Sequence, residues 1–545
     1  MRQATVARRL PVRQAVAGIA ADGTPVNGVP LVITAIDEPF EPTPKGDQTL
    51  RLAGSPSGIP TLDPALARDI DTTFVVRQIF RGLISFDSDL QPIPELADRI
   101  EITADGLSYK FHLRDGAKFQ DGRPISSDDV VSSLTRAMSP ATAGGDPSLL
   151  GGPAFLSDIV GAQELLSGQV DNLTGVSKVD DQSVEIRLTE PRATFLMKLA
   201  SVPASIVDRM QLIQGADWWR EPNGSGPFHL TKLTDERDLQ LAPSDEWFEG
   251  APPMHEVDIA LGQSALQPFN LYQSGQVDIS PVDLNGVDRA LSPESGLNDQ
   301  VLVTPQLAVE YIAFNIHDEP MTDPHIRRAL QLGFPRDKVA EVTYDGYVGK
   351  ACGLIPDGML GRNWPCENVN FDLEAAKKEI AHSKYGSADK VPPIEIYTAG
   401  SQSTDALRNS IEQSLSLKVD VIEVDWNEFL NGLSIHEYPA YSIYWSADYP
   451  DPESLLWTLF SSVSKDNYVD YHNDRFERLL AQAAAEPNEA KRIDLYAQAQ
   501  QLLLDDGVVM PLYYDVSYTL VRPYVKGLDV TAIGILGFEH IWLER

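Results

Sequence analysis

Residues 111–137 read FHLRDGAKFQDGRPISSDDVVSSLTRA, and the second half of this stretch predicts a helix. Pro124 and Ser126 open that half, and two acids follow at Asp128 and Asp129. Acidic side chains in a first turn suit the positive end of a helix dipole. We therefore expect a helix to begin here and to run to about Met138.

Helices and strands interleave irregularly on both sides of this helix. The segments TLRLAG, SVEIRL, PIEIYTA and VDVIEVDW read as strands. Apolar residues at positions i, i+3 and i+4 predict helices in DTTFVVRQIFRGLI, DPHIRRALQLGF, DLEAAKKEIAHS and DRFERLLAQAAAEPNEAKRIDLYAQAQQLLLDDG. The chain has 545 residues, too many for a single core. This pattern predicts an α/β protein of several lobes.

Composition excludes several classes of partner. The net charge is −35, so we expect no nucleic acid partner and no charge-driven binding to an anionic membrane. No stretch approaches the length of about 18 apolar residues that a membrane-spanning helix needs. Charged residues make up 23% of the chain and apolar residues 43%, as is usual for a soluble globular protein.

The first 45 residues differ from the rest. They begin with basic residues but contain neither the apolar core of a signal peptide nor a lipobox cysteine. The stretch from Gly18 to Ile36 predicts a small hairpin, with its turn at Asp22-Gly23 or Asn27-Gly28. A proline-rich linker, EPFEPTPKGD, follows. We interpret residues 1–45 as an appendage of unknown role, or as a gene start that lacks its export signal.

The chain shows no familiar catalytic or cofactor motif. No P-loop, G-x-G-x-x-G, G-x-S-x-G, H-E-x-x-H or C-x-x-C occurs, and the nine histidines are scattered singly. The acids Asp448, Asp451 and Glu453 could form a glycosidase pair or a metal cluster, but Pro450 and Pro452 hold them in a loop. We therefore expect no enzyme, no cofactor and no metal site.

Aromatic residues in the last quarter of the chain are more informative. The segment YSIYWSADYPDPESLL, residues 441–456, predicts a strand from Tyr441 to Trp445 that ends just before Asp448. Flat apolar rings with a few polar groups are typical of a small-molecule site. Core packing of the rings, above all of Tyr513 and Tyr514, stays an open alternative.

Seven segments in order resemble one family, the extracytoplasmic solute-binding proteins of ABC importers, in the peptide/nickel-binding branch (family 5). They are TLDP (61–64), IFRGLISFD (79–87), the stretch 111–137, GSGPFHL (224–230), YIAFNIHDEPMTDPHIRRALQLGFPRDKV (311–339), WSADYPDP (445–452) and MPLYYDVSYTLVRPYVKGL (510–528). The resemblance covers residues 49 to 530.

The resemblance implies a three-lobed, periplasmic-binding-protein-like clamp (type II, cluster C) that closes on its ligand. Two α/β lobes would be joined by a two-crossover hinge near residues 307 and 505, and a further lobe would be added. Lobe I would be discontinuous, lobe II would be the extra lobe, and the appendage would precede them. The boundaries are 46–79, 205–307 and 506–545 for lobe I, 80–204 for lobe II, and 308–505 for lobe III.

The resemblance also implies a binding site for a peptide or peptide-like solute. Asp448 would receive the ligand's α-amino group, since a carboxylate and an ammonium attract strongly in a water-poor cleft. Tyr444, Trp445 and Ser446 would offer backbone groups to an extended peptide. Trp426 would wall a side-chain pocket. The remaining expected contacts are backbone at Arg68, Asp69 and Ile70, together with Tyr311 and Asp515.

Some residues depart from the family pattern. The segment HEYPAYSIYW contains no arginine or lysine to fix a ligand carboxylate, and Asp515 stands where a tyrosine often packs on the ligand. These differences favour a ligand with a cationic end, or one without a free carboxylate. A sugar, a metal chelate or a cationic metabolite therefore stays an alternative to a peptide.

In this family the expected partners are an ABC permease and its ATPase subunits, with the binding protein a monomer. The expected location is extracytoplasmic, where Cys352 and Cys366 would form a disulfide; two free thiols are the alternative. Two other functions remain open. One is a solute-sensing receptor or regulator that docks a partner through residues 1–45, and the other is a hydrolase that uses the acids around Asp448.

Overall fold

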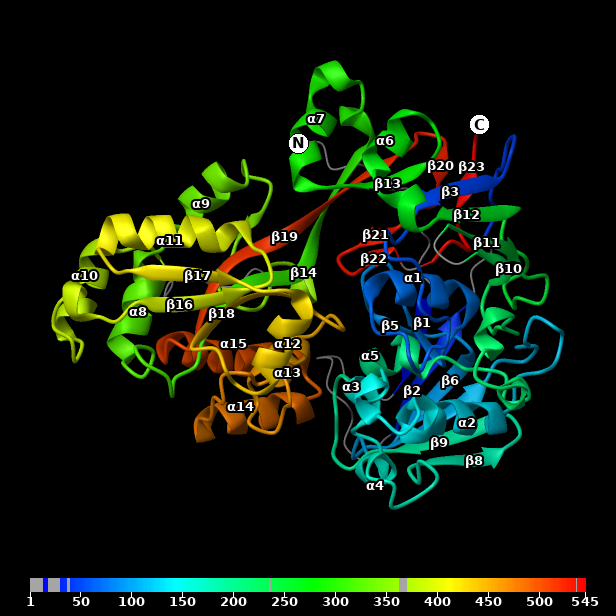
Figure 1. The fold of residues 1–545 in the computed structure, drawn as a ribbon. Coiled ribbons are helices and arrows are strands. Elements are labelled where there is room, and N and C mark those ends of the chain that lie inside the picture. Colours follow the sequence, from blue (N-terminus) through cyan, green and yellow to red (C-terminus); the bar gives the residue numbers. More distant parts are fainter. Residues whose placement is uncertain (1–12, 18–29, 37–39, 235–236, 362–369, 536) are drawn as a thin grey trace. The chain divides into compact units, whose positions relative to one another are not determined.

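The computed structural model describes residues 13–17, 30–36, 40–234, 237–361, 370–535 and 537–545 (Figure 1). The chain forms two compact units. The first consists of residues 1–303 and 518–545, and the second of residues 304–517. The chain passes from one unit to the other inside strand β14 (Val301–Phe314) and again inside strand β19 (Val509–Val521). The three-lobed division and the hinge near residues 307 and 505 stay predictions.

The first unit contains an antiparallel sheet of six strands in the order β1-β2-β6-β7-β9-β8. Its strands are β1 (Arg13–Ala17), β2 (Leu31–Ile36), β6 (Ala97–Ile102), β7 (Ser108–Leu113), β8 (Val176–Asp180) and β9 (Ser183–Arg187). β1 is therefore an edge strand of this sheet, and β2 joins it to β6. The two turns considered for the N-terminal hairpin lie outside the described residues.

Helix α2 (Ser127–Met138) packs against β8 and β9, and it confirms the helix expected after Pro124. A capping box fixes its first turn. The Asp129 carboxylate accepts from both the Ser126 backbone N–H (3.0 Å) and the Ser126 hydroxyl (2.7 Å).

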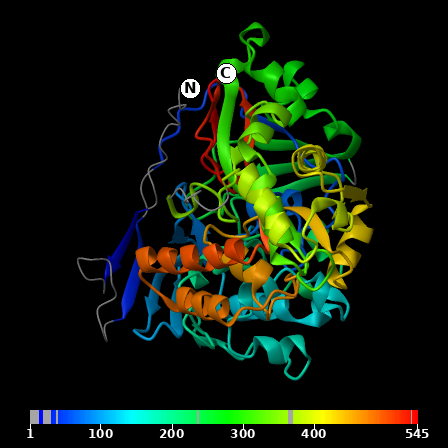
Figure 2. The same ribbon diagram turned by 90° about the vertical axis from the view of Figure 1, so that its left-hand side faces the viewer.

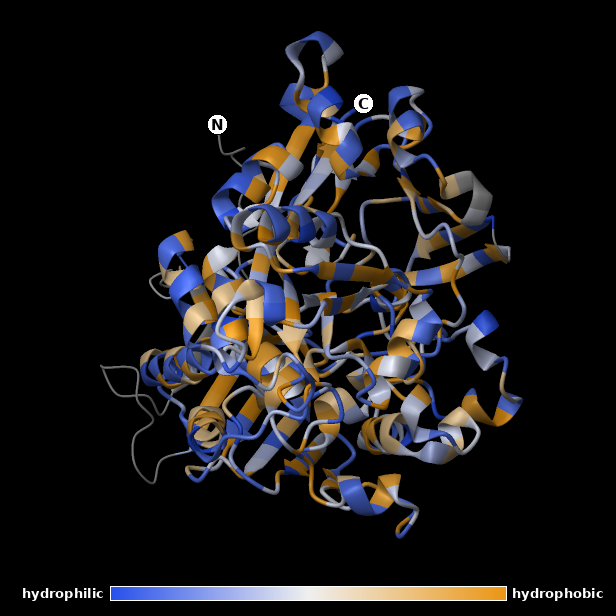
Figure 3. Ribbon diagram, turned by 60° about the vertical axis from the view of Figure 1, so that its left-hand side comes forward, coloured by the Kyte–Doolittle hydropathy of each residue, from blue (hydrophilic) through white to orange (hydrophobic). Residues whose placement is uncertain are grey.

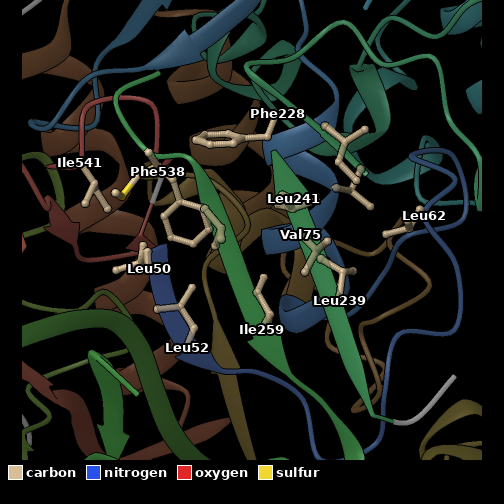
Figure 4. Packing of buried hydrophobic residues seen from close by; sticks show 14 of the residues in the cluster. Leu50, Leu52, Leu62, Val75, Phe228, Leu239, Leu241, Ile259, Phe538 and Ile541 are labelled. Atoms are coloured by element: carbon tan, nitrogen blue, oxygen red, sulfur yellow. The ribbon is translucent and has the colours of Figure 1, made fainter. Parts of the chain in front are cut away.

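A second group of strands in the first unit surrounds its main apolar core (Figure 4). The strands are β3 (Thr49–Ala53), β10 (Phe228–Thr234), β11 (Asp238–Pro243), β12 (Glu256–Ala260) and β13 (Ile279–Val282). Helix α1 (Ile70–Ile79) places Val75 in this core. Strand β3 pairs parallel with β12, and its inward residues Leu50 and Leu52 are almost fully buried. The alternation predicted from TLRLAG is thus confirmed.

The second unit is built on the sheet order β19-β14-β18-β16-β17. β14 and β18 (Ala440–Ser446) are antiparallel, whereas β16 (Ile394–Thr398) runs parallel to both β18 and β17 (Val419–Glu423). Hydrophobic and hydrophilic residues alternate along its strands and helices (Figure 3).

Helices cover this sheet. They are α8 (Pro324–Gly333), α9 (Arg336–Thr343), α10 (Leu373–His382), α11 (Gln402–Leu415), α12 (Trp426–Ser434), α13 (Glu453–Phe460), α14 (Asp474–Ala485) and α15 (Glu489–Asp505). α14 and α15 lie side by side (Figure 2). In the described part of the chain no helix has the length and apolarity to span a membrane.

Candidate ligand-binding site

Strand β18 presents an edge that is open toward its C-terminal end. The Ala447 N–H donates to the Leu307 carbonyl (2.8 Å), so Ala447 and Leu307 form a hydrogen-bonded pair that continues the antiparallel pairing of β18 with β14. The direction of backbone hydrogen bonding alternates along a strand, so the backbone N–H and C=O of Trp445, two residues before Ala447, also point toward β14. The backbone groups of Tyr444 and Ser446 then point to the opposite edge.

β16 covers only the beginning of that opposite edge. The register of β16 with β18 consists of one pair, Tyr397 with Tyr441, and β16 ends one residue later at Thr398. Among the described residues, no strand pairs with β18 at Tyr444 or Ser446 on this side. The structure therefore leaves a short run of backbone donors and acceptors free for an added strand.

Asp448 lies two residues beyond this edge. Its backbone N–H donates to the Ser454 hydroxyl (2.7 Å), but no described residue forms a hydrogen bond or ion pair with its carboxylate. The side chain is exposed, yet surrounding protein atoms displace much of its hydration. This loss of hydration raises the pKa of Asp448 to about 7, and the negative charge of Asp466 adds to the effect.

The neighbouring acid Asp451 has a structural role. It is fully buried and bonds Arg492 of α15 (Oδ2 to Nε, 3.0 Å), while its other oxygen accepts from the Glu453 N–H (3.0 Å). Burial raises the pKa of Asp451 to about 6, and Arg492 opposes this shift. Asp451 thus anchors the loop, and Asp448 is left as the acid that has no partner in the described part of the chain.

Aromatic residues pack on the face of β18 that carries Tyr441, near the beginning of the strand. Trp426, the first residue of α12, is 55% exposed, and its ring lies 6.0 Å from that of Phe429. Phe429 in turn packs edge-on against Tyr441 at 6.4 Å. The buried Trp445 indole N–H has no hydrogen-bond partner among the described residues.

On the other face, Tyr444 lies opposite Glu310 of β14 and is 43% exposed. Its hydroxyl donates to Asp515 (2.9 Å), and both loss of hydration and this carboxylate raise the pKa of Tyr444. Glu310 is buried, and it accepts hydroxyl hydrogen bonds from Ser442 (3.0 Å) and from Ser401. Asp515 therefore orients Tyr444.

The other expected site residues are Tyr311 of β14 and the segment from Arg68 to Ile70. Tyr311 is 1% exposed and packs against Phe460 at 6.2 Å, so its placement gives it a packing role. Arg68, Asp69 and Ile70 belong to the first unit. The Asp69 carboxylate caps α1 by accepting from the Thr72 N–H (2.8 Å), and Arg68 and Ile70 are exposed. Their contact with a ligand stays a prediction.

No local pattern in the sequence points to Asp466 or to the Asp451–Arg492 pair, because charges that are distant along the chain meet only in the folded protein. Cys366 lies outside the described residues, so the Cys352–Cys366 disulfide stays a prediction. Among the described residues, no group of three or more histidine, cysteine or acidic side chains could hold a metal ion.

Comparison with known proteins decides the family. The family model described as "Bacterial extracellular solute-binding proteins, family 5 Middle" matches residues 91–467. The chain belongs to this family. The family and the α/β fold class expected from the sequence are thereby confirmed, and the members of the family are binding proteins.

Family 5 relatives match along nearly the whole chain. The Escherichia coli periplasmic oligopeptide-binding protein OppA is 29% identical over 519 residues, which are 91% of this chain and 92% of that protein. The Escherichia coli dipeptide-binding protein is 27% identical over 515 residues, 90% and 93% of the two chains.

Solved structures of family 5 share the fold. The Escherichia coli murein tripeptide binding protein MppA has a TM-score of 0.75 and 23% identity, and covers 92% of this chain and 99% of its own. Helicobacter pylori DppA in complex with the peptide STSA has a TM-score of 0.75 and 22% identity, with 91% and 98% covered.

Proposed function

We propose that this protein is the substrate-binding component of an ABC import system, which captures a short peptide and delivers it to a membrane permease. The observation that carries the proposal is the open edge of β18 beside Asp448, whose carboxylate has no partner among the described residues. Relatives named for oligopeptide and dipeptide binding support a peptide ligand.

The chemistry of the site fits the main chain of a peptide. An extended ligand would add to β18 by pairing its backbone with Tyr444 and Ser446. Its α-amino group would reach Asp448, so the ligand would run antiparallel to β18 from that end. Backbone pairing does not depend on side chains, and it therefore allows many sequences to bind.

The first test is mass spectrometry of small molecules released from the purified protein by mild denaturation. We expect a series of short peptides with free amino groups. A single sugar, metal chelate or non-peptide metabolite in their place would contradict the proposed ligand class.

Binding of an amine-bearing peptide should weaken as the pH falls below 7. In the free protein the pKa of Asp448 is about 7, so below that pH the carboxyl group is protonated and must release its proton to pair with an ammonium. Affinity should be highest between about pH 7 and 8, fall by about tenfold per pH unit well below 7, and fall again above about pH 8, where the α-amino group of the free peptide loses its proton. Titration calorimetry between pH 5 and 9 measures this.

Asp466→Asn provides a matched control for the pH dependence. Removing this second carboxylate takes away one of the two causes that raise the Asp448 pKa, so the fall in affinity should move to lower pH. A pH profile that is flat from 5 to 9 in the wild type would contradict the role given to Asp448.

A further inference from the structure

The point at which β16 ends decides how much of the β18 edge is open. β16 runs parallel to β18 with Tyr397 opposite Tyr441, and it ends at Thr398. If the chain continued in this register, Ser401 would lie opposite Trp445 and would cover the part of the edge that is now open. The open edge therefore requires the chain to leave the line of β16 before it reaches Ser401.

The chain leaves this line at Gly400. The φ angle of Gly400 is +106°, a backbone conformation that glycine adopts far more readily than other residues. Its N–H donates to the Thr398 hydroxyl (3.2 Å), and Ser401 is then the N-cap residue of helix α11. The turn thus directs the chain into α11 and away from β18.

A buried carboxylate ties the end of this turn to the sheet. Oε1 of Glu310 in β14 accepts hydrogen bonds from the Ser401 hydroxyl and from the Ser442 hydroxyl of β18 (3.0 Å). Glu310 is 4% exposed and lies opposite Tyr444 in the pairing of β14 with β18. One oxygen atom therefore joins the start of α11 to β18, directly beside the open edge. All of these residues belong to the second unit.

Glu310 carries out this role without a cation. Its further partner is the Tyr513 hydroxyl of β19, and loss of hydration together with the negative charge of Glu310 raises the pKa of Tyr513. In the described part of the chain no lysine or arginine forms an ion pair with Glu310. A buried carboxylate that lacks a counter-charge is costly unless hydrogen bonds satisfy it. The hydroxyl groups from three elements supply those bonds.

The Ser401 hydroxyl is available for Glu310 because another side chain caps α11. A serine at an N-cap position commonly accepts from an N–H group of its helix, but the Ser401 side chain makes no such bond. The Tyr344 hydroxyl accepts from the Ser403 N–H in its place, and it lies 2.6 Å from the Ser403 hydroxyl. The contact of Ser401 with Glu310 therefore serves the connection to the sheet and not the cap.

We propose that Glu310 is a positioning residue for peptide binding, which holds Ser401 to Ser442 and thereby keeps the β18 edge open for the ligand. Without this contact, the segment from Ala399 to Ser401 can shift toward β18 and occupy the edge where the main chain of the peptide would pair. The inference rests on the proposed function and names the residue that maintains its site.

The test combines calorimetry with tri-alanine at pH 8 and hydrogen exchange of the Tyr444 and Ser446 backbone amides in the ligand-free protein. Glu310→Ala should weaken the binding of tri-alanine by about five- to thirtyfold. Exchange at the two amides should slow by at least about threefold, because the shifted segment covers them. A general loss of structure would instead make this exchange faster.

Three further variants separate the contact from the fold. Ser401→Ala removes the same contact from its other end and leaves the Tyr344 cap in place, so it should reproduce both changes. Glu310→Gln should retain most of the affinity, because its side-chain oxygen can still accept from both serines. Ser414→Ala is the matched control, since the Ser414 hydroxyl of α11 donates within its own helix, to the Ser410 carbonyl. It should keep the affinity and the exchange of the wild type.

Wild-type affinity in both Glu310→Ala and Ser401→Ala would overturn this inference and leave the proposed function standing. Weaker binding without slower exchange at Tyr444 and Ser446 would overturn it as well, because that result indicates a general structural role. Absence of tri-alanine binding by the wild type would overturn both the inference and the proposed function.

Discussion

Asp448→Asn is expected to weaken the binding of a peptide with a free amino group by about 2–5 kcal/mol, or about 30- to 4,000-fold. In the wild type the carboxylate would pair with the ammonium of the ligand in a site of reduced hydration. The asparagine variant would leave that ammonium without a counter-charge. Titration calorimetry at pH 8, where Asp448 is ionised, measures the loss.

An N-acetylated ligand separates this pairing from any change of shape. The wild type should bind the acetylated peptide weakly, and Asp448→Asn should bind the free and acetylated forms about equally. A large coupling energy between the two changes identifies a direct contact. Wild-type affinity in Asp448→Asn would show that the acid does not hold the ligand.

The same variant should stabilise the ligand-free protein above pH 7. The pKa of Asp448 is raised in the folded state, so between about pH 4 and 7 the folded protein binds more protons than the unfolded chain. The free energy of unfolding therefore falls as the pH rises through this window. Asparagine carries no charge, so the variant does not lose this part of its free energy of unfolding as the pH rises. The wild type therefore keeps a carboxylate that lowers its stability, because the carboxylate serves ligand binding.

Arg492→Met is expected to destabilise the second unit by about 3–5 kcal/mol, because it leaves the Asp451 carboxylate buried without its cation. The double variant Asp451→Asn/Arg492→Met should recover most of this loss. Asparagine is neutral, and its side-chain oxygen can still accept from the Glu453 N–H.

This loss of stability is measured by urea denaturation, with the hydrogen exchange of backbone amides in β18, α13 and α15 as the readout. Exchange is needed because a chain of two units need not unfold in one step. A loss below about 1 kcal/mol in Arg492→Met, or no recovery in the double variant, would contradict the anchoring role of the pair.

The sequence predicts the elements better than it predicts their side-chain partners. The strand expected from Tyr441 to Trp445 is confirmed as β18, and the helix after Pro124 as α2, because alternation and capping are local signals. The position of Asp448 just beyond the strand is equally local.

Partners distant in the sequence could not be predicted. Asp448, Asp451 and Glu453 look alike in the sequence, and only the structure shows that Asp451 is paired with Arg492, 41 residues away. Tyr311 belongs to a matching motif, but its side chain is buried in the core. Which strand edge stays open depends on where β16 ends relative to β18, and this is a property of the folded sheet.

The most direct test of the account is a calorimetric titration of the wild-type protein with tri-alanine and with N-acetyl-tri-alanine at pH 8. We predict that one molecule of tri-alanine binds per chain and that acetylation weakens binding by at least about 30-fold. Equal affinity for the two ligands, or no binding of tri-alanine, would contradict a peptide site built on the β18 edge and Asp448.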